Sequence, residues 1–140
     1  MKISRKRITL IVVALFCLIG LIYMAVYLKS IADYKKAVEK TTFTNIDISD
    51  IPDGVYIGEY DVNVIYAKVE VTVENGEITN IIILEHRNER GKPAEAVINK
   101  IVEEQKIDVD AVSAATNSST VIKKAVENAL YFKDMVFRST

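Results

Sequence analysis

Hydrophobic residues form one continuous run near the start of the chain and shorter, patterned groups after it. The run covers residues 8–28 and contains neither a charged residue nor a proline. At ~1.5 Å rise per residue in a helix, it is long enough to cross the ~30 Å hydrocarbon core of a bilayer. We therefore predict a transmembrane helix over residues 8–28, and we assign residues 1–29 to a basic tip and membrane anchor.

The charges on either side of this run predict its orientation. Only Lys29 follows the run closely, whereas four basic residues precede it: Lys2, Arg5, Lys6 and Arg7. Lys and Arg are retained on the cytoplasmic side of a membrane. We expect a single-pass protein of the cell membrane, with a cytoplasmic N-terminus and an extracytoplasmic C-terminal domain.

A cleaved signal peptide is the competing interpretation of the same run. Signal peptides usually have an apolar core of about 7–15 residues and a small-x-small cleavage site. This run is longer, and no convincing site follows it. Phe16 is too bulky a neighbour for Cys17 to mark a lipoprotein cleavage site. Cys17 is the only cysteine, so the chain has no disulfide framework, and we expect Cys17 to pack in the membrane helix.

Residues 30–52 are expected to form a stalk and linker. Ser30 to about Lys40 has helical spacing of its apolar residues and either continues the anchor or forms a short helix. Thr41–Pro52 has mixed polar character. Asp53-Gly54 is a turn signal, and we place the start of the folded extracytoplasmic domain there, at residues 53–140.

Alternating apolar residues predict an antiparallel sheet in the first half of this domain. Val55–Tyr60 is a first strand. Asn75-Gly76 is a preferred two-residue hairpin turn, because both positions tolerate positive φ, and it joins strands Val64–Glu74 and Glu77–His86. The expected register opposes Val73 to Ile78, Val71 to Asn80, Val69 to Ile82, Ala67 to Leu84 and Ile65 to His86 on the buried face, with Ile81 and Ile83 on the charged face.

Two amphipathic helices are predicted for the second half. Pro93 suits a first helical turn, and the apolar residues after it follow one helix face: Ala94, Val97, Ile98, Ile101 and Val102. We expect a short strand at residues 107–112 and a last helix from Val121 to about Phe132. Strands in a run, followed by two helices, predict an α+β domain with both helices packed on an antiparallel sheet.

The charge distribution and the residue types present argue against several function classes. Residues 1–29 contain 5 of the 18 Lys and Arg and no Asp or Glu, which leaves 13 basic and 19 acidic residues in 30–140. An acidic outer domain argues against nucleic acid as a partner and against this domain lying flat on anionic lipid. His86 is the only histidine, and no cluster of side chains has metal-ligand spacing. The sequence has no Gly-x-Ser-x-Gly elbow, so a hydrolase is also disfavoured.

Small and hydroxyl residues are most concentrated just before the last helix, in Asp108–Thr120. The hydroxyl residues there are Ser113, Thr116, Ser118, Ser119 and Thr120. Such residues usually cap the free N–H groups of a helix start, an interpretation that needs no ligand. The same N–H groups and small side chains also suit a phosphate. His86 likewise has two interpretations, a structural histidine of the buried face or a functional side chain.

A resemblance to a known family lies in this stretch. Asp110-Ala-Val-Ser113-Ala-Ala-Thr116, followed by Asn117-Ser-Ser, resembles the flavinylation motif of the FMN-binding domain family. That family includes the peripheral flavin subunits of the sodium-pumping NADH:quinone reductase and of the Rnf complex. Gly54-Val-Tyr-Ile-Gly58 resembles the opening strand of the family, and His86, Gly91 and Ala94-Glu-Ala resemble its middle stretch. The usual motif has glycine where this chain has Ala114.

The resemblance implies that Thr116 carries FMN covalently. A flavin transferase would move FMN from FAD onto the threonine hydroxyl as a phosphoester. Asp110 would have a structural or transferase-recognition role, and His86 and Tyr56 would lie near the flavin ring. The other cofactor-binding residues implied are Ser113, Ala114, Ala115, Asn117 and Ser118.

On this resemblance the protein is an electron carrier rather than an independent enzyme. Its expected partners are the flavin transferase, an electron donor in or near the membrane, and an acceptor outside or in a neighbouring complex. Two alternatives remain open. One is a membrane-anchored binding or sensory module of the same fold without flavin. The other is a small flavin-dependent reductase of an external acceptor, which the short chain disfavours because it has no second domain for a substrate.

Overall fold

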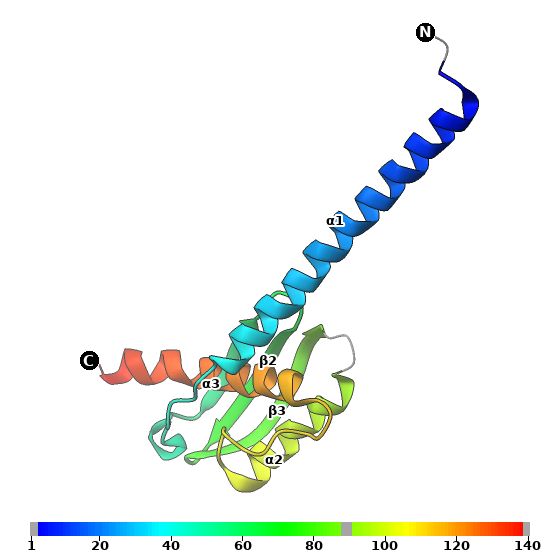
Figure 1. Cartoon of the computed structure of the whole chain (residues 1–140). Helices are drawn as coiled ribbons and strands as arrows, with labels where there is room; N and C mark the ends of the chain where they lie inside the picture. The colour runs from blue at the N-terminus through cyan, green and yellow to red at the C-terminus, as the bar shows by residue number, and fades with distance from the viewer. Residues whose placement is uncertain (1–2, 88–90, 139–140) are drawn as a thin grey trace. The chain divides into compact units, whose positions relative to one another are not determined.

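The computed structural model describes residues 3–87 and 91–138, with side chains up to Tyr131. Lys2 and part of the charged loop, residues 88–90, lie outside the described residues. The chain forms two compact units, Met1–Asp33 and Tyr34–Thr140, and each is described by itself. The elements are α1 (Arg5–Glu39), η1 (Ile48–Asp50), β1 (Gly54–Asp61), β2 (Tyr66–Glu74), β3 (Glu77–Arg87), η2 (Lys92–Ala96), α2 (Val97–Glu104) and α3 (Thr116–Arg138) (Figure 1).

The predicted membrane segment is part of one long helix, α1. Its side chains at residues 8–28 are exposed, and its most apolar window has a mean hydropathy of 2.8. By length and composition α1 can cross a membrane, and a signal sequence near an N-terminus meets the same criteria. The helix predicted from Ser30 is the last part of α1, which ends at Glu39.

The second unit has the predicted α+β architecture. β1, β2 and β3 form an antiparallel sheet in that order, and α2 and α3 pack on it (Figure 1). β1 directs Tyr56 and Gly58 into the core and leaves Val55 and Ile57 exposed. The buried core from the sheet and helices includes Val69, Val71, Val73, Ile78, Val97, Ile101, Val121, Ile122 and Val126.

The hairpin turn is as predicted, but the register of β3 away from the turn is not. Val73 pairs with Ile78 as expected, after which two bulges shift the pairing. The first makes Ile81 the partner of Val71, so Ile81 is buried and Ile82 is 45% exposed. The second leaves Leu84 47% exposed, and it returns His86 to the inner face opposite Ala67. An extra residue in one strand reverses the faces of the residues that follow, which explains the error.

The connection between α2 and α3 also differs from the prediction. Residues 107–112 were expected to form a strand, but they lie in no strand. α2 ends at Glu104, and the capping residue after it, Gln105, has a left-handed backbone. The side-chain amide of Gln105 bonds both backbone groups of Ile78, each at 2.8 Å, and so takes the place of a strand partner there. α3 begins at Thr116 and not at Val121, so its first turn contains the hydroxyl residues.

Residues just before the sheet also belong to the second unit. Val38, Ile48 and Ile51 are buried in its core, which periodicity alone did not indicate. Residues 42–44, here called the strap, are bound to α3. Lys124 Nζ donates to Thr42 O at 2.8 Å, and Thr44 N–H donates to Glu127 Oε2 at 3.2 Å.

α3 approaches β1 more closely than a side chain would permit. A Cβ placed on Gly58 would lie 2.2 Å from Ala125 O and 2.3 Å from Ala129 N. Asn128 Nδ2 donates to Glu59 O at 2.9 Å in the same region. Because Gly58 has no side chain, α3 can pack this closely against β1.

Candidate functional site

An open hollow lies at the start of α3. It has a volume of about 330 Å³. Its lining comes from four separate parts of the second unit: Tyr34, Ile65, Gly91, Ala114, Ala115, Thr116, Asn117 and Ser118. Five of the predicted site residues, 114–118, therefore line the hollow, and they are consecutive in the sequence. Tyr34 and Ile65 had not been predicted as site residues, because in the sequence they look like ordinary apolar positions of a helix and a strand.

Thr116 combines exposure with a position at a helix start. It is the first residue of α3, and its side chain is exposed on the lining of the hollow. The helical hydrogen bonds begin with Ser119 N–H donating to Ala115 O at 2.9 Å. The N–H groups of residues 116–118 therefore precede the intrahelical ladder, where they and the helix dipole favour an anion. The arrangement suits a phosphate ester on the Thr116 hydroxyl.

The turn before Thr116 is stabilised by one buried serine. Ser119 is fully buried, and its Oγ donates to Ala115 O at 2.8 Å and accepts from Val112 N–H at 3.0 Å. Ala115 N–H donates to Val112 O at 3.0 Å. These bonds close a tight turn over residues 112–115. Ser113 and Ala114 lie exposed at its tip, while Ser118 is buried against the hollow.

Ala114 has a left-handed backbone, with φ of 64°. This is the position where the resembled motif has glycine. For a residue with a Cβ, this conformation costs roughly 1–2 kcal/mol because the Cβ crowds the next carbonyl oxygen. Ala114 is therefore a strained residue within this turn.

Replacing Ala114 by glycine is expected to stabilise the second unit by about 1 kcal/mol, which raises Tm by about 4–8 °C. The gain is smaller than the full strain, because glycine also increases the entropy of the unfolded chain. Thermal unfolding measures it. Ala115→Gly is the matched control, since Ala115 is buried and has no positive φ, and its Tm should fall. An unchanged or lower Tm for Ala114→Gly would argue against strain at this turn.

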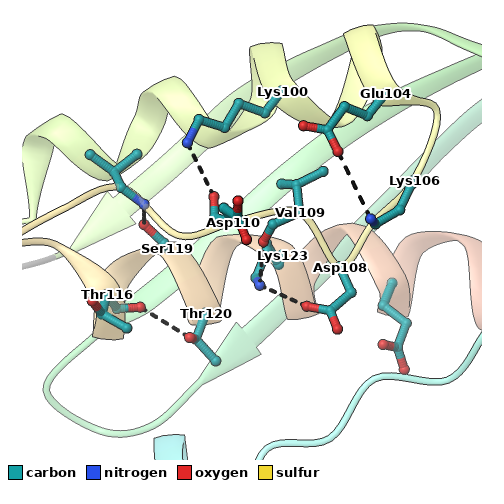
Figure 2. A network of polar contacts seen from close by, with 12 residues as sticks. Lys100, Glu104, Lys106, Asp108, Val109, Asp110, Thr116, Ser119, Thr120 and Lys123 are labelled. Atoms are coloured by element: carbon teal, nitrogen blue, oxygen red, sulfur yellow. Dashed lines mark hydrogen bonds and ion pairs between the residues drawn. The ribbon is translucent and has the colours of Figure 1, made fainter.

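Lysine side chains hold the backbone that leads into the turn. Lys123 Nζ donates to Val109 O at 2.8 Å and to Asp108 Oδ1 at 2.9 Å (Figure 2). Lys100 Nζ donates to Asp110 O at 3.4 Å, and the Asp110 side chain is exposed. Lys123 cannot be recognised from the sequence as a site residue, because a single lysine inside an apolar helix pattern carries no distinctive signal.

Tyr56 and His86 do not line the hollow. The Tyr56 hydroxyl donates to Pro52 O, and burial, followed by the nearby charge of Asp53, raises the pKa of Tyr56. The His86 side chain is 2% exposed, and its Nδ1 lies 3.1 Å from Glu95 Oε1. The structure therefore places both predicted residues inside the fold, with partners of their own.

The His86–Glu95 contact joins the end of β3 to η2, just after Gly91. Glu95 Oε2 also lies 3.1 Å from Lys92 Nζ. Burial acts to raise the pKa of Glu95, but the hydrogen bonds from His86 and Lys92 outweigh it and lower this pKa below its ordinary value of 4.5. The ionised carboxylate therefore stabilises the region that positions Gly91.

The folded state is expected to lose stability as the pH falls below about 4.5 and through the lower pKa of Glu95. A carboxyl whose pKa is lowered by folding stabilises the fold above its unfolded pKa, and that contribution is lost on protonation. Glu95→Gln should reduce the change in Tm between pH 6 and pH 3. Glu103→Gln, at an exposed position of α2, is the control and should leave the pH profile as in the wild type. Identical profiles for all three proteins would refute the assignment.

Residues 66–131 match the family model of the FMN-binding domain. This range runs from β2 into α3, and it includes Gly91 and residues 114–118 of the hollow. No curated protein matches the chain. The resemblance read from the motif is thereby confirmed for residues 66–131, which match the FMN-binding domain.

Proposed function

We propose that the protein is a membrane-anchored electron-transfer flavoprotein whose extracytoplasmic domain carries FMN as a phosphoester on Thr116. The family match supports FMN as the cofactor, and α1 supports attachment to a membrane. The observation that carries the covalent linkage is the position of Thr116. It is an exposed hydroxyl residue at the first position of α3, on the lining of the hollow.

The residues around Thr116 fit the phosphate end of this cofactor. The N–H groups of residues 116–118 precede the helical ladder and are oriented for an anion. Ala114 and Ala115 are small enough to let a ligand approach the backbone. Asn117 and Ser118 add polar side chains, and Tyr34 and Ile65 add aromatic and apolar surface. A volume of about 330 Å³ is at the small end of ligand sites, which range from roughly 300 to 1,000 Å³, and suits a cofactor held at the surface.

The attachment reaction balances without an additional oxidant or reductant. The Thr116 Oγ1–phosphorus bond forms, and the pyrophosphate P–O bond of FAD breaks. AMP leaves, and the hydroxyl proton passes to a base of the transferase or to water. Bound FMN supplies the electron-transfer chemistry, while the protein supplies the tether and the electrostatic surroundings.

An extracytoplasmic location would give a reason for a covalent bond between FMN and the protein. The four basic residues before the apolar run 8–28 favour a cytoplasmic N-terminus and a second unit outside the cytoplasm. A flavin lost there could not readily be replaced, so a covalent bond keeps the carrier functional. The partners in this proposal are the flavin transferase, an electron donor in or near the membrane, and an acceptor outside or in a neighbouring complex.

An intact mass of the full-length protein, made together with an active flavin transferase, tests the proposal. We expect a mass increase equal to FMN minus water, and tandem mass spectrometry should assign it to the peptide containing Thr116. Protein made without the transferase is the control. No mass increase, while the same transferase modifies another substrate, would overturn the covalent proposal and favour a binding or sensory module without flavin.

A further inference from the structure

The backbone between α2 and the hollow is held by side chains. Residues 106–115, here called the entry segment, lie in no helix or strand, so sheet or helix hydrogen bonds do not fix their path. Figure 2 shows contacts that do so from two sides. Lys123 on α3 donates to Val109 O at 2.8 Å, and Lys100 on α2 approaches Asp110 O at 3.4 Å. Ser119 Oγ accepts from Val112 N–H at 3.0 Å.

Lys123 is the most deeply buried charged side chain in this group. The whole residue is 6% exposed. Its ammonium group lies 2.9 Å from Asp108 Oδ1 and 4.7 Å from the centre of the Phe43 ring in the strap. Burying an ammonium group is costly unless it is paired and hydrogen-bonded. Here the pairing is directed at two consecutive residues of the entry segment.

The entry segment leads directly to the residues that a modifying enzyme must reach. Asp110, Ser113, Ala114 and Thr116 are all exposed. Val109, by contrast, is 2% exposed, so the segment is fixed at one end and presented at the other. A segment already held in its bound conformation loses less conformational entropy when a partner binds it.

We infer that Lys123 is a positioning residue for flavin attachment, because its ammonium group fixes Asp108 and Val109 so that residues 110–116 are presented to the flavin transferase in one conformation. This inference rests on the proposed function. Lys123 does not contact the reacting atoms. It acts through the backbone, and the new phosphoester bond forms on Thr116 Oγ1 as AMP leaves.

Lys123→Met is the informative variant, since methionine keeps an unbranched side chain in the buried space and removes the ammonium group. Lys124→Met is the matched control. Lys124 is the next residue on α3, and its ammonium group holds Thr42 O and Glu127 Oε1 but no atom of the entry segment. Each full-length variant is incubated with transferase and FAD, and the initial rate of FMN incorporation is measured by intact mass at several protein concentrations. Thermal unfolding of each apo variant identifies a temperature at which all are folded.

At that temperature, Lys123→Met should lower the kcat/KM of the transferase for this protein by about tenfold or more, because misplaced reacting groups lose rate steeply. Lys124→Met should stay within about twofold of wild type, even though it disturbs a buried ion pair. Lys123→Met modified at the wild-type rate, or equal losses in both variants that follow their Tm, would overturn the inference alone. Failure of the wild type to acquire FMN would overturn the proposed function as well.

Discussion

Gly58→Ala is expected to destabilise the second unit by about 3 kcal/mol or more, at the upper end of overpacking substitutions. The added methyl group would lie 2.2 Å from Ala125 O and 2.3 Å from Ala129 N. Both contacts are with the backbone, so no rotamer change relieves them. α3 would have to move away from β1, which separates apolar side chains along the helix–sheet interface. Because Thr116 begins α3, flavin attachment should decrease together with stability.

The measurement is thermal unfolding of full-length protein in mild detergent, followed by circular dichroism. For a domain of this size the Tm should fall by about 12 °C or more. Gly54→Ala is the matched control in the same strand. Its new methyl group would meet the hydroxyl end of the Tyr56 side chain at 3.2 Å, a contact that a small side-chain movement relieves. Equal Tm changes in the two variants would show that β1 and α3 are not as closely packed as described.

Thr116→Ala is expected to abolish covalent flavin incorporation. The variant removes the only atom of residue 116 that can form the phosphoester and leaves the helix start in place. Thr116 Oγ1 supports no described part of the fold, since the contact within the first turn is Thr120 Oγ1 donating to Thr116 O at 3.0 Å. We therefore expect a mass without added FMN and a Tm within about 1 °C of the wild-type apo protein, as for an ordinary surface substitution.

Two further variants test whether flavin incorporation needs a hydroxyl group at residue 116 itself or only a hydroxyl group near the start of α3. Thr116→Ser keeps a hydroxyl group and should retain some incorporation. Thr120→Ala removes a hydroxyl one turn later on the same helix and should leave incorporation unchanged. Retention of the FMN mass in Thr116→Ala would move the attachment to another residue of the hydroxyl cluster, with Ser113 as the next exposed candidate.

The fold class could be read from the sequence because its signals are local. Asn75-Gly76 specifies a tight turn by backbone preference alone, and alternating residues on either side specify strands. The helix after Pro93 and the apolar run at residues 8–28 have equally direct periodicities. These features identify the α+β domain and α1 without reference to tertiary contacts.

The errors occur where the structure depends on distant partners. The bulges of β3 exchange the burial of Ile81 and Ile82, and their position depends on the packing of the whole sheet on α2 and α3. The start of α3 was placed too late, because residues 116–120 are polar and extend no apolar periodicity. The motif located residues 114–118 of the hollow, whereas Tyr34 and Ile65 reach it only through the tertiary fold.

The contacts of the strap have a consequence for the order in which the chain can fold. Thr44 N–H and Glu127 Oε2 are 83 residues apart in sequence, and Lys124 Nζ and Thr42 O are 82 apart. Contacts between such distant residues slow folding, because a long loop must close before they form. During synthesis, the strap emerges well before α3, so these two hydrogen bonds cannot form until the last helix follows. If the proposed function holds, flavin attachment at the start of α3 is therefore expected after export of nearly the whole chain.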